Sequence, residues 1–299
     1  MKVILSRKGF DSASGGMPSP ILPDGTLICL PVPRDRPGSG TAYGSIRAVT
    51  GASLAQIMNQ LRVPVPPDGA HLDPDLVHAA VPRDAGWRPL FGQDSQAERH
   101  LENQHVAPGD LFLFFGLFRQ TVLVDGQLRW APRAPRLHVL FGYLEIGEIR
   151  HIGSPADVAD LPWAAGHPHV KVWHRPGNTL YVAAARSELA PGWPGAGLFR
   201  FSATTRLTRP GAITSIWQLP AAFASCAQHL SYHMDAKRWH IQSDGTVILH
   251  TVGRGQEFVT EADDGLNDWT RQLIEATAAE EPASWEASLL APNAFKNAE

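Results

Sequence analysis

The chain has 299 residues, of which 43% are hydrophobic and 18% charged, and its net charge is −3 at pH 7. These values are typical of a globular protein with one large or two ordinary domains, and they exclude a strongly basic nucleic-acid coating protein. No apolar run approaches the ~20 residues of a membrane span, and residues 1–5 are too short an apolar stretch for a signal peptide. We therefore expect a cytoplasmic protein. Its two cysteines, Cys29 and Cys226, have no CxxC spacing and exclude a thiolate zinc site.

The first half of the chain is predicted to mix short strands, loops and two helices. Strands are expected at 2–5 and 27–32, joined by a turn at 23–25. A helix over 53–61 has Ser53 as its N-cap, and a proline-rich loop then runs from 62 to 91. A polar helix is expected over 95–105. Long loops of this kind are uncommon in compact domains and often carry function.

The second half is predicted to be mainly strands. Asp125-Gly126 and Asp244-Gly245 are hairpin signals, and the expected strands cover 109–119, 122–124, 128–130, 137–149, 179–185, 197–201 and 246–250. Helices are expected at 219–227 and 266–279. The fold class is α+β, with a mostly antiparallel, curled or barrel-like sheet and a few peripheral helices. The chain forms either a single unit over 1–299 or two lobes, 1–130 and 131–299.

The loop after the first strand combines charged, hydroxyl and glycine residues in a way that suits anion binding. Cationic side chains and accessible backbone N–H groups both recognise phosphate or carboxylate. The candidate residues here are Arg7, Lys8, Asp11, Ser12, Gly15 and Gly16. The alternative is a packed loop in which Lys8 and Asp11 form an internal ion pair.

A second candidate site begins at His71-Leu72-Asp73. HxD with a distant histidine is the pattern of a facial iron triad, and His233 is the candidate second imidazole. The alternative is that His71 and Asp73 only order the loop. His167-Pro168-His169 could also bind a metal, but the proline and the lack of a neighbouring carboxylate favour a surface loop.

Polar residues gather again between residues 231 and 257. They include groups that can stack on a base, read its edge or move a proton: Tyr232, His233, Arg254, Gln256 and Glu257. Together with the first loop they supply the acid, base and anion binder that a ligand site requires. For one site, segments 7–16, 71–75 and 231–257 must converge.

These segments resemble the nucleotide modification associated domain proteins, third group. The resemblance covers nearly the whole chain and is carried by residues 6–12, 15–16, 18–25, 71–74, 114–116, 231–233 and 255–259. It implies a role with systems that hypermodify bases in DNA, many of them phage-related, as gene neighbourhoods suggest. It assigns no reaction, cofactor or catalytic residue. Residues 109–115 and 142–149 are also similar to strands of the PUA and ASCH barrels, which commonly hold a nucleobase.

Three functional hypotheses follow. In the first, the protein acts on or binds a nucleotide or a base in DNA, with Lys8, Asp11, His71, Asp73, His233 and Glu257 as catalytic groups. In the second, it is a non-catalytic reader of modified nucleic acid that uses strands 109–150 and a basic rim of Arg119, Arg129, Arg133 and Arg136. In the third, it is a metal-dependent oxygenase built on His71, Asp73 and His233.

Overall fold

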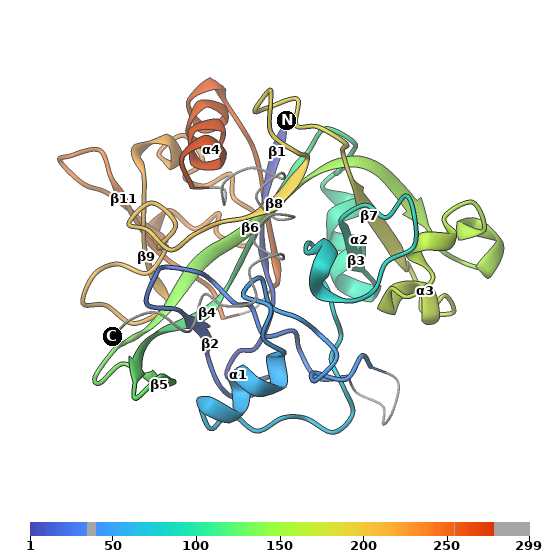
Figure 1. Ribbon diagram of the computed structural model, residues 1–299. Coiled ribbons are helices and arrows are strands. Elements are labelled where there is room, and N and C mark those ends of the chain that lie inside the picture. Colours follow the sequence, from blue (N-terminus) through green and yellow to red (C-terminus); the bar gives the residue numbers. More distant parts are fainter. Residues whose placement is uncertain (35–39, 254, 278–299) are drawn as a thin grey trace.

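A computed structural model describes residues 1–34, 40–253 and 255–277 (Figure 1). Its larger sheet has the order β12-β1-β4-β6-β7-β3, while β2 and β5 pair with β4 and β8 pairs with β6. These strands are β1 (Lys2–Arg7), β2 (Ser19–Ile21), β3 (Leu90–Gln93), β4 (Leu111–Val124), β5 (Gln127–Trp130), β6 (Arg136–His151), β7 (Thr179–Ala183), β8 (Ala196–Leu198) and β12 (Glu257–Glu261). A smaller sheet, β10-β11-β9, contains β9 (Ile216–Leu219), β10 (Trp239–Ile241) and β11 (Val247–His250).

In the part of the chain that the structure describes, four α-helices and five short 3-10 helices surround the sheets (Figure 1). The α-helices are α1 (Leu54–Gln60), α2 (Ser95–Asn103), α3 (Pro168–Lys171) and α4 (Asp264–Thr277). The 3-10 helices are η1 (His78–Ala80), η2 (Pro155–Val158), η3 (Pro162–Ala164), η4 (Ala221–Phe223) and η5 (Ala236–Arg238). None of these described helices has the length and apolar character needed to cross a membrane.

The predicted α+β class is confirmed, although the sheets are not closed into a barrel. Most neighbouring strands are antiparallel, but β1 and β2 both run parallel to β4. β1 lies between β4 and β12, so the first strand joins the last one in the larger sheet. The pairing brings Ser6 opposite Glu257 and thus places the end of the first strand beside the start of the last.

The larger sheet is covered on both faces, which explains its nearly continuous apolar strands. Successive side chains of a strand point to opposite faces. Val3 and Leu5 accordingly pack into one core with Phe115 and Trp217, whereas Ile4 packs into another with Phe112. A third core lies under α1.

Local signals predicted several elements correctly. Ser53 is the N-cap of α1 and makes a capping box with Gln56, and helix α2 lies within the predicted range. Asp125 and Gly126 have φ angles of 50° and 71° and form the β4–β5 turn, as a two-residue hairpin requires.

Two predicted elements differ in the structure. Residues 27–32 form only an isolated bridge at Leu27, because neighbouring Pro20 has no N–H group and the Leu30 N–H is bound by the Ser19 hydroxyl. In the segment 219–227, Leu219 ends β9 and only the single turn η4 is helical, with i→i−3 hydrogen bonds at Phe223 and Ala224.

Candidate functional site

The first polar cluster is buried where the ends of β1 and β3 meet the start of β12. The Lys8 Nζ lies 2.7 Å from Glu257 Oε1, and the Gln93 Nε2 donates to the same oxygen at 2.6 Å. The Lys8 side chain is 10% exposed and that of Glu257 only 1%. We call Lys8, Gln93 and Glu257 the Glu257 cluster. Its ammonium also lies 4.3 Å from the centre of the Phe91 ring.

One oxygen of this cluster has no partner among the described residues. Glu257 Oε2 is buried and makes no hydrogen bond to any of them, while Oε1 accepts two. A buried polar atom without a partner is costly, so it calls for an explanation such as a catalytic role or a bound ion or water. The Glu257 cluster therefore offers a ready acceptor to a ligand.

A second carboxylate, Glu98 on α2, lies near the Glu257 cluster. Burial, reinforced by the charges of Glu102 and Glu257, raises the pKa of Glu98 to about 7. The Tyr181 hydroxyl lies 2.9 Å from both oxygens of Glu98. A carboxyl group that titrates near neutral pH is suited to acid–base chemistry.

The rim of this region contains His100 and Tyr232. The His100 Nε2 lies 3.0 Å from the Ser231 hydroxyl, and its ring lies 4.5 Å from the ring of Tyr232. Burial lowers the pKa of His100, opposed by the charge of Glu257. Tyr232 has a positive φ of 64°. Because the residue is 43% exposed, part of its ring is available for stacking.

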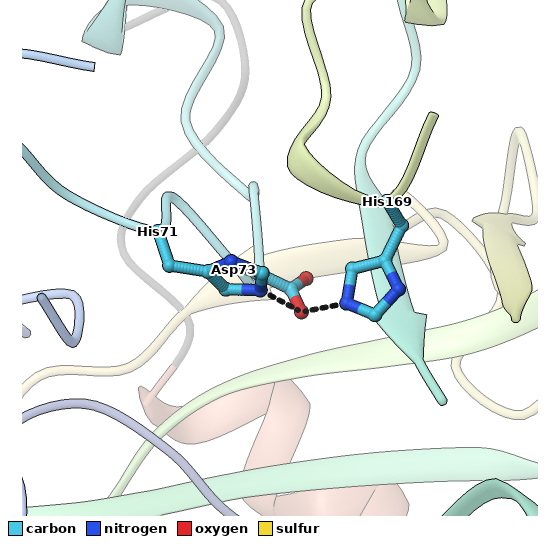
Figure 2. A group of neighbouring side chains, drawn as sticks. All are labelled: His71, Asp73 and His169. Carbon is cyan, nitrogen blue, oxygen red and sulfur yellow. Dashed lines mark ion pairs between the residues drawn. The ribbon is translucent and has the colours of Figure 1, made fainter. Parts of the chain in front are cut away.

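The second polar cluster surrounds Asp73, on the loop that leads to β3 (Figure 2). The Nε2 atoms of His71 and His169 both lie 3.6 Å from Asp73 Oδ2, and the carboxylate sits between the two rings. His167 Nε2 lies 3.5 Å from Asp73 Oδ1, which also accepts the Gly92 N–H at 2.9 Å. We call His71, Asp73, His167 and His169 the Asp73 cluster.

The Asp73 cluster is enclosed by protein. His167 and His169 are each 3% exposed, so the predicted surface loop at this motif is wrong. His167 is instead the N-cap of α3, and Pro168 in the first turn favours the start of the helix. Burial alone would raise the pKa of Asp73, but the neighbouring imidazoles of His167 and His71 hold it well below its usual range.

Strand β3 connects the two clusters. The Gly92 N–H binds Asp73, and the next residue, Gln93, binds Glu257. A Cβ atom on Gly92 would lie 2.3 Å from the His169 ring, so only glycine leaves room for the imidazole. Segments 7–8 and 257 thus meet directly, and segment 71–75 is linked to them through β3.

The remaining predicted residues occupy different positions. Asp11 accepts the N–H groups of Ala13 and Ser14 and pairs at 3.9 Å with Arg7, so the alternative Lys8–Asp11 pair is not formed. Ser12, Gly15 and Gly16 are exposed, and a Cβ atom on Gly15 would lie 2.3 Å from the Phe10 ring. Gln256 is exposed and its carbonyl accepts the Arg7 N–H. Arg254 lies outside the described residues.

His233 is fully buried and occupied by the backbone. Its Nδ1 lies 3.0 Å from the Ser231 carbonyl, and its Nε2 accepts the Val252 N–H. The histidine that joins His71 and Asp73 is His169 and not His233. The ligand atoms of these three residues lie within 4.8 Å of one another. Asp75, beside that group, is bound by both terminal nitrogens of Arg83.

The strands proposed for a reader lie largely inside the protein. The rings of Phe112, Phe114 and Phe118 are fully buried and pack on other aromatic rings. On the proposed basic rim, Arg119 and Arg129 donate to backbone carbonyls of Ala131 and Gln60.

Sequence reasoning missed Gln93, Glu98 and Tyr181, and it misread His169. Only the His167-Pro168-His169 motif gave a signal. Gln93 and Tyr181 lie singly on short, fully buried strands, and Glu98 lies on an amphipathic helix.

Comparison with family models matches residues 2–261 to nucleotide modification associated domain 3. Searches of curated proteins and of solved structures found no match.

Proposed function

Because the chain belongs to the nucleotide modification associated domain 3 family, we propose that it binds a nucleotide, or a base in DNA, at the Glu257 cluster. The observation that carries this proposal is the unpartnered Oε2 of Glu257. The family implies a role associated with nucleotide modification, and among the described residues this is the buried carboxylate oxygen that has no hydrogen bond.

The chemistry of the cluster suits the edge of a base. Carboxylates accept from the amino groups of bases, and side-chain amides pair with base edges that carry both a donor and an acceptor. Glu257 supplies the acceptor, and the Gln93 amide lies beside it. Tyr232, at the rim, offers a ring face for stacking. Arg7 is 31% exposed on its side chain and pairs with Asp11 at 3.9 Å, so it can turn toward a phosphate.

Glu98 gives the same region a group for proton transfer. Its pKa of about 7 means that both protonation states are populated near neutral pH, as a general acid or base requires. A reaction at the bound base would use Glu98 for that transfer and Glu257 for orientation.

Binding of the four deoxynucleoside monophosphates, and of short single-stranded DNA, tests the proposal. Glu257→Gln replaces the acceptor oxygen with a donor and should weaken binding of the preferred ligand at least about tenfold, as loss of a charged hydrogen bond predicts. Glu261→Gln is the matched control, because it lies on the same strand with a side chain that is 77% exposed.

A second variant, Gln93→Met, leaves the Lys8–Glu257 pair in place and should also weaken binding. Circular dichroism and thermal melting establish that each variant is folded. Equal affinity in Glu257→Gln, Gln93→Met and the unaltered protein would overturn the proposal. Absence of binding by any of these ligands to the unaltered protein would do the same.

A further inference from the structure

The Asp73 cluster has the donor set of a transition-metal site. His71, Asp73 and His169 each offer one ligand atom, and these three atoms lie within 4.8 Å of one another. Two imidazoles and one carboxylate bind zinc in hydrolytic enzymes and iron in non-haem oxygenases. This group shares no residue with the Glu257 cluster. On β3, Gly92 contacts Asp73 and the next residue, Gln93, contacts Glu257.

The distances fit a metal better than direct hydrogen bonds. Both Nε2–Oδ2 separations are 3.6 Å, beyond the range of an N–H···O hydrogen bond. Ligands that bind one tetrahedral zinc at 2.0–2.1 Å lie about 3.3 Å from each other. The two Nε2–Oδ2 separations exceed this value by about 0.3 Å, and the two Nε2 atoms lie within 4.8 Å of each other, so a shared ion would draw the two imidazoles closer together.

The hydrogen bonds of His169 orient its ring for metal binding. Asn178 donates its Nδ2 to the His169 carbonyl at 2.8 Å, so its Oδ1 faces the ring as an acceptor. The His169 Nδ1, 2.7 Å from that oxygen, must carry the proton. Nε2 is then the ring nitrogen that faces Asp73 and the one available as a metal ligand. An amide or carbonyl that fixes the tautomer in this way is typical of metal-bound histidines.

His167 supplies a further, independent indication. Its Nδ1 accepts the His169 N–H, which leaves the proton on Nε2. That nitrogen is buried, has no hydrogen-bond partner among the described residues and lies 3.5 Å from Asp73 Oδ1. Oδ1 is the oxygen that accepts the Gly92 N–H, whereas His71 and His169 lie nearest to Oδ2.

We propose that His71 Nε2, Asp73 Oδ2 and His169 Nε2 bind one divalent transition-metal ion, with Asn178 and His167 as positioning residues. Three protein ligands leave at least one coordination position open, as in catalytic rather than structural sites. A cavity of about 80 Å³ with mainly apolar walls is lined by Asp73 and Asp75, although not by His71 or His169.

Titration of the metal-free protein with Zn²⁺, followed by calorimetry, tests the site. We expect one equivalent per chain, and Co²⁺ in its place should give visible absorption bands whose intensity reports the coordination number. His169→Ala and Asp73→Asn should each abolish this equivalent. Asp73→Asn retains an acceptor for the Gly92 N–H and thus the local fold. His174→Ala is the control, because His174 is an exposed histidine close to α3 in sequence.

Several results would overturn the proposal. These are the absence of a stoichiometric ion in the unaltered protein, an unchanged affinity in Asp73→Asn, or an equal loss of affinity in His174→Ala. If His169→Ala does not fold, the proposal is tested by Asp73→Asn and by the thermal shift of the unaltered protein. A bound ion must raise its melting temperature with Zn²⁺ concentration, whereas Mg²⁺, which prefers oxygen ligands, must not. Nucleotide binding at the Glu257 cluster is measured without metal, so either proposal can fail alone.

Discussion

The Lys8 ammonium and the Glu257 carboxylate, 249 positions apart in the chain, lie 2.7 Å from each other inside the protein. β1 and β12 are neighbours in the sheet, and the two side chains leave the backbone where those strands end and begin. A pair this buried requires each partner to neutralise the other.

Removing only the cation should therefore be costly. Lys8→Met is expected to lower the free energy of unfolding by about 3–5 kcal/mol, because it leaves Glu257 charged and buried. The double variant Lys8→Met/Glu257→Gln should recover much of that loss. Urea denaturation of the single and double variants measures the coupling. Lys2→Met, whose partner Glu261 is exposed, should cost less than about 1 kcal/mol. Losses that simply add in the double variant would contradict a coupled pair.

Glu98 should make stability fall as pH rises. Its pKa is raised from 4.5 to about 7 in the folded protein, so the folded state binds a proton more tightly than the unfolded state. The resulting stabilisation is complete below pH 4.5 and is lost as pH rises through about 7. Over that interval the unaltered protein should lose about 3 kcal/mol relative to Glu98→Gln, measured by denaturation at each pH. A difference that does not vary with pH would show that Glu98 titrates normally.

Gly92 should tolerate no side chain. Gly92→Ala places a Cβ 2.3 Å from the His169 ring and should cost about 1–3 kcal/mol while displacing that imidazole. Denaturation and zinc titration of the same variant measure both effects. Gly166→Ala, whose Cβ would meet no atom within 4 Å, should change stability by less than about 0.5 kcal/mol. Similar costs in the two variants would mean that the contact with His169 is unimportant.

Asn178 should influence metal affinity without binding the ion. Asn178→Leu removes the acceptor that holds the proton on His169 Nδ1 and should weaken Zn²⁺ binding by about 10–100-fold. Asn178→Asp keeps an acceptor and should restore affinity to within a few-fold. If Asn178 were only structural, both variants would have lower melting temperatures than the unaltered protein. The less stable of the two would then also bind Zn²⁺ more weakly.

The basic rim should not contribute to nucleotide binding. Arg133→Glu is expected to leave mononucleotide affinity unchanged, since Arg133 lies in the loop between β5 and β6 and not at the Glu257 cluster. A reader that uses this face would instead lose DNA affinity and show a smaller salt dependence. Filter binding at several salt concentrations separates these outcomes.

Much of the secondary structure was predictable because its signals are local. The capping box at Ser53, the Asp125-Gly126 turn and the apolar runs of β4 and β6 depend on residues that are close in sequence. The absence of a strand at residues 27–32 was not a local effect. It depended on Pro20 and Ser19 of β2, which lie alongside this segment. Whether the sheet closes into a barrel was not predictable from the sequence, because closure depends on how the strands at the two edges of the sheet pair.

Sequence alone identified the chemical residue types and the family, including Lys8, Glu257, His71 and Asp73 as residues of interest. Only the tertiary structure decided which of them meet. It joined Lys8 to Glu257 through the pairing of the first and last strands, and it placed His169 beside Asp73 while the backbone occupied His233. Such contacts depend on strand order and on the path of loops, which bring together residues that no local pattern relates.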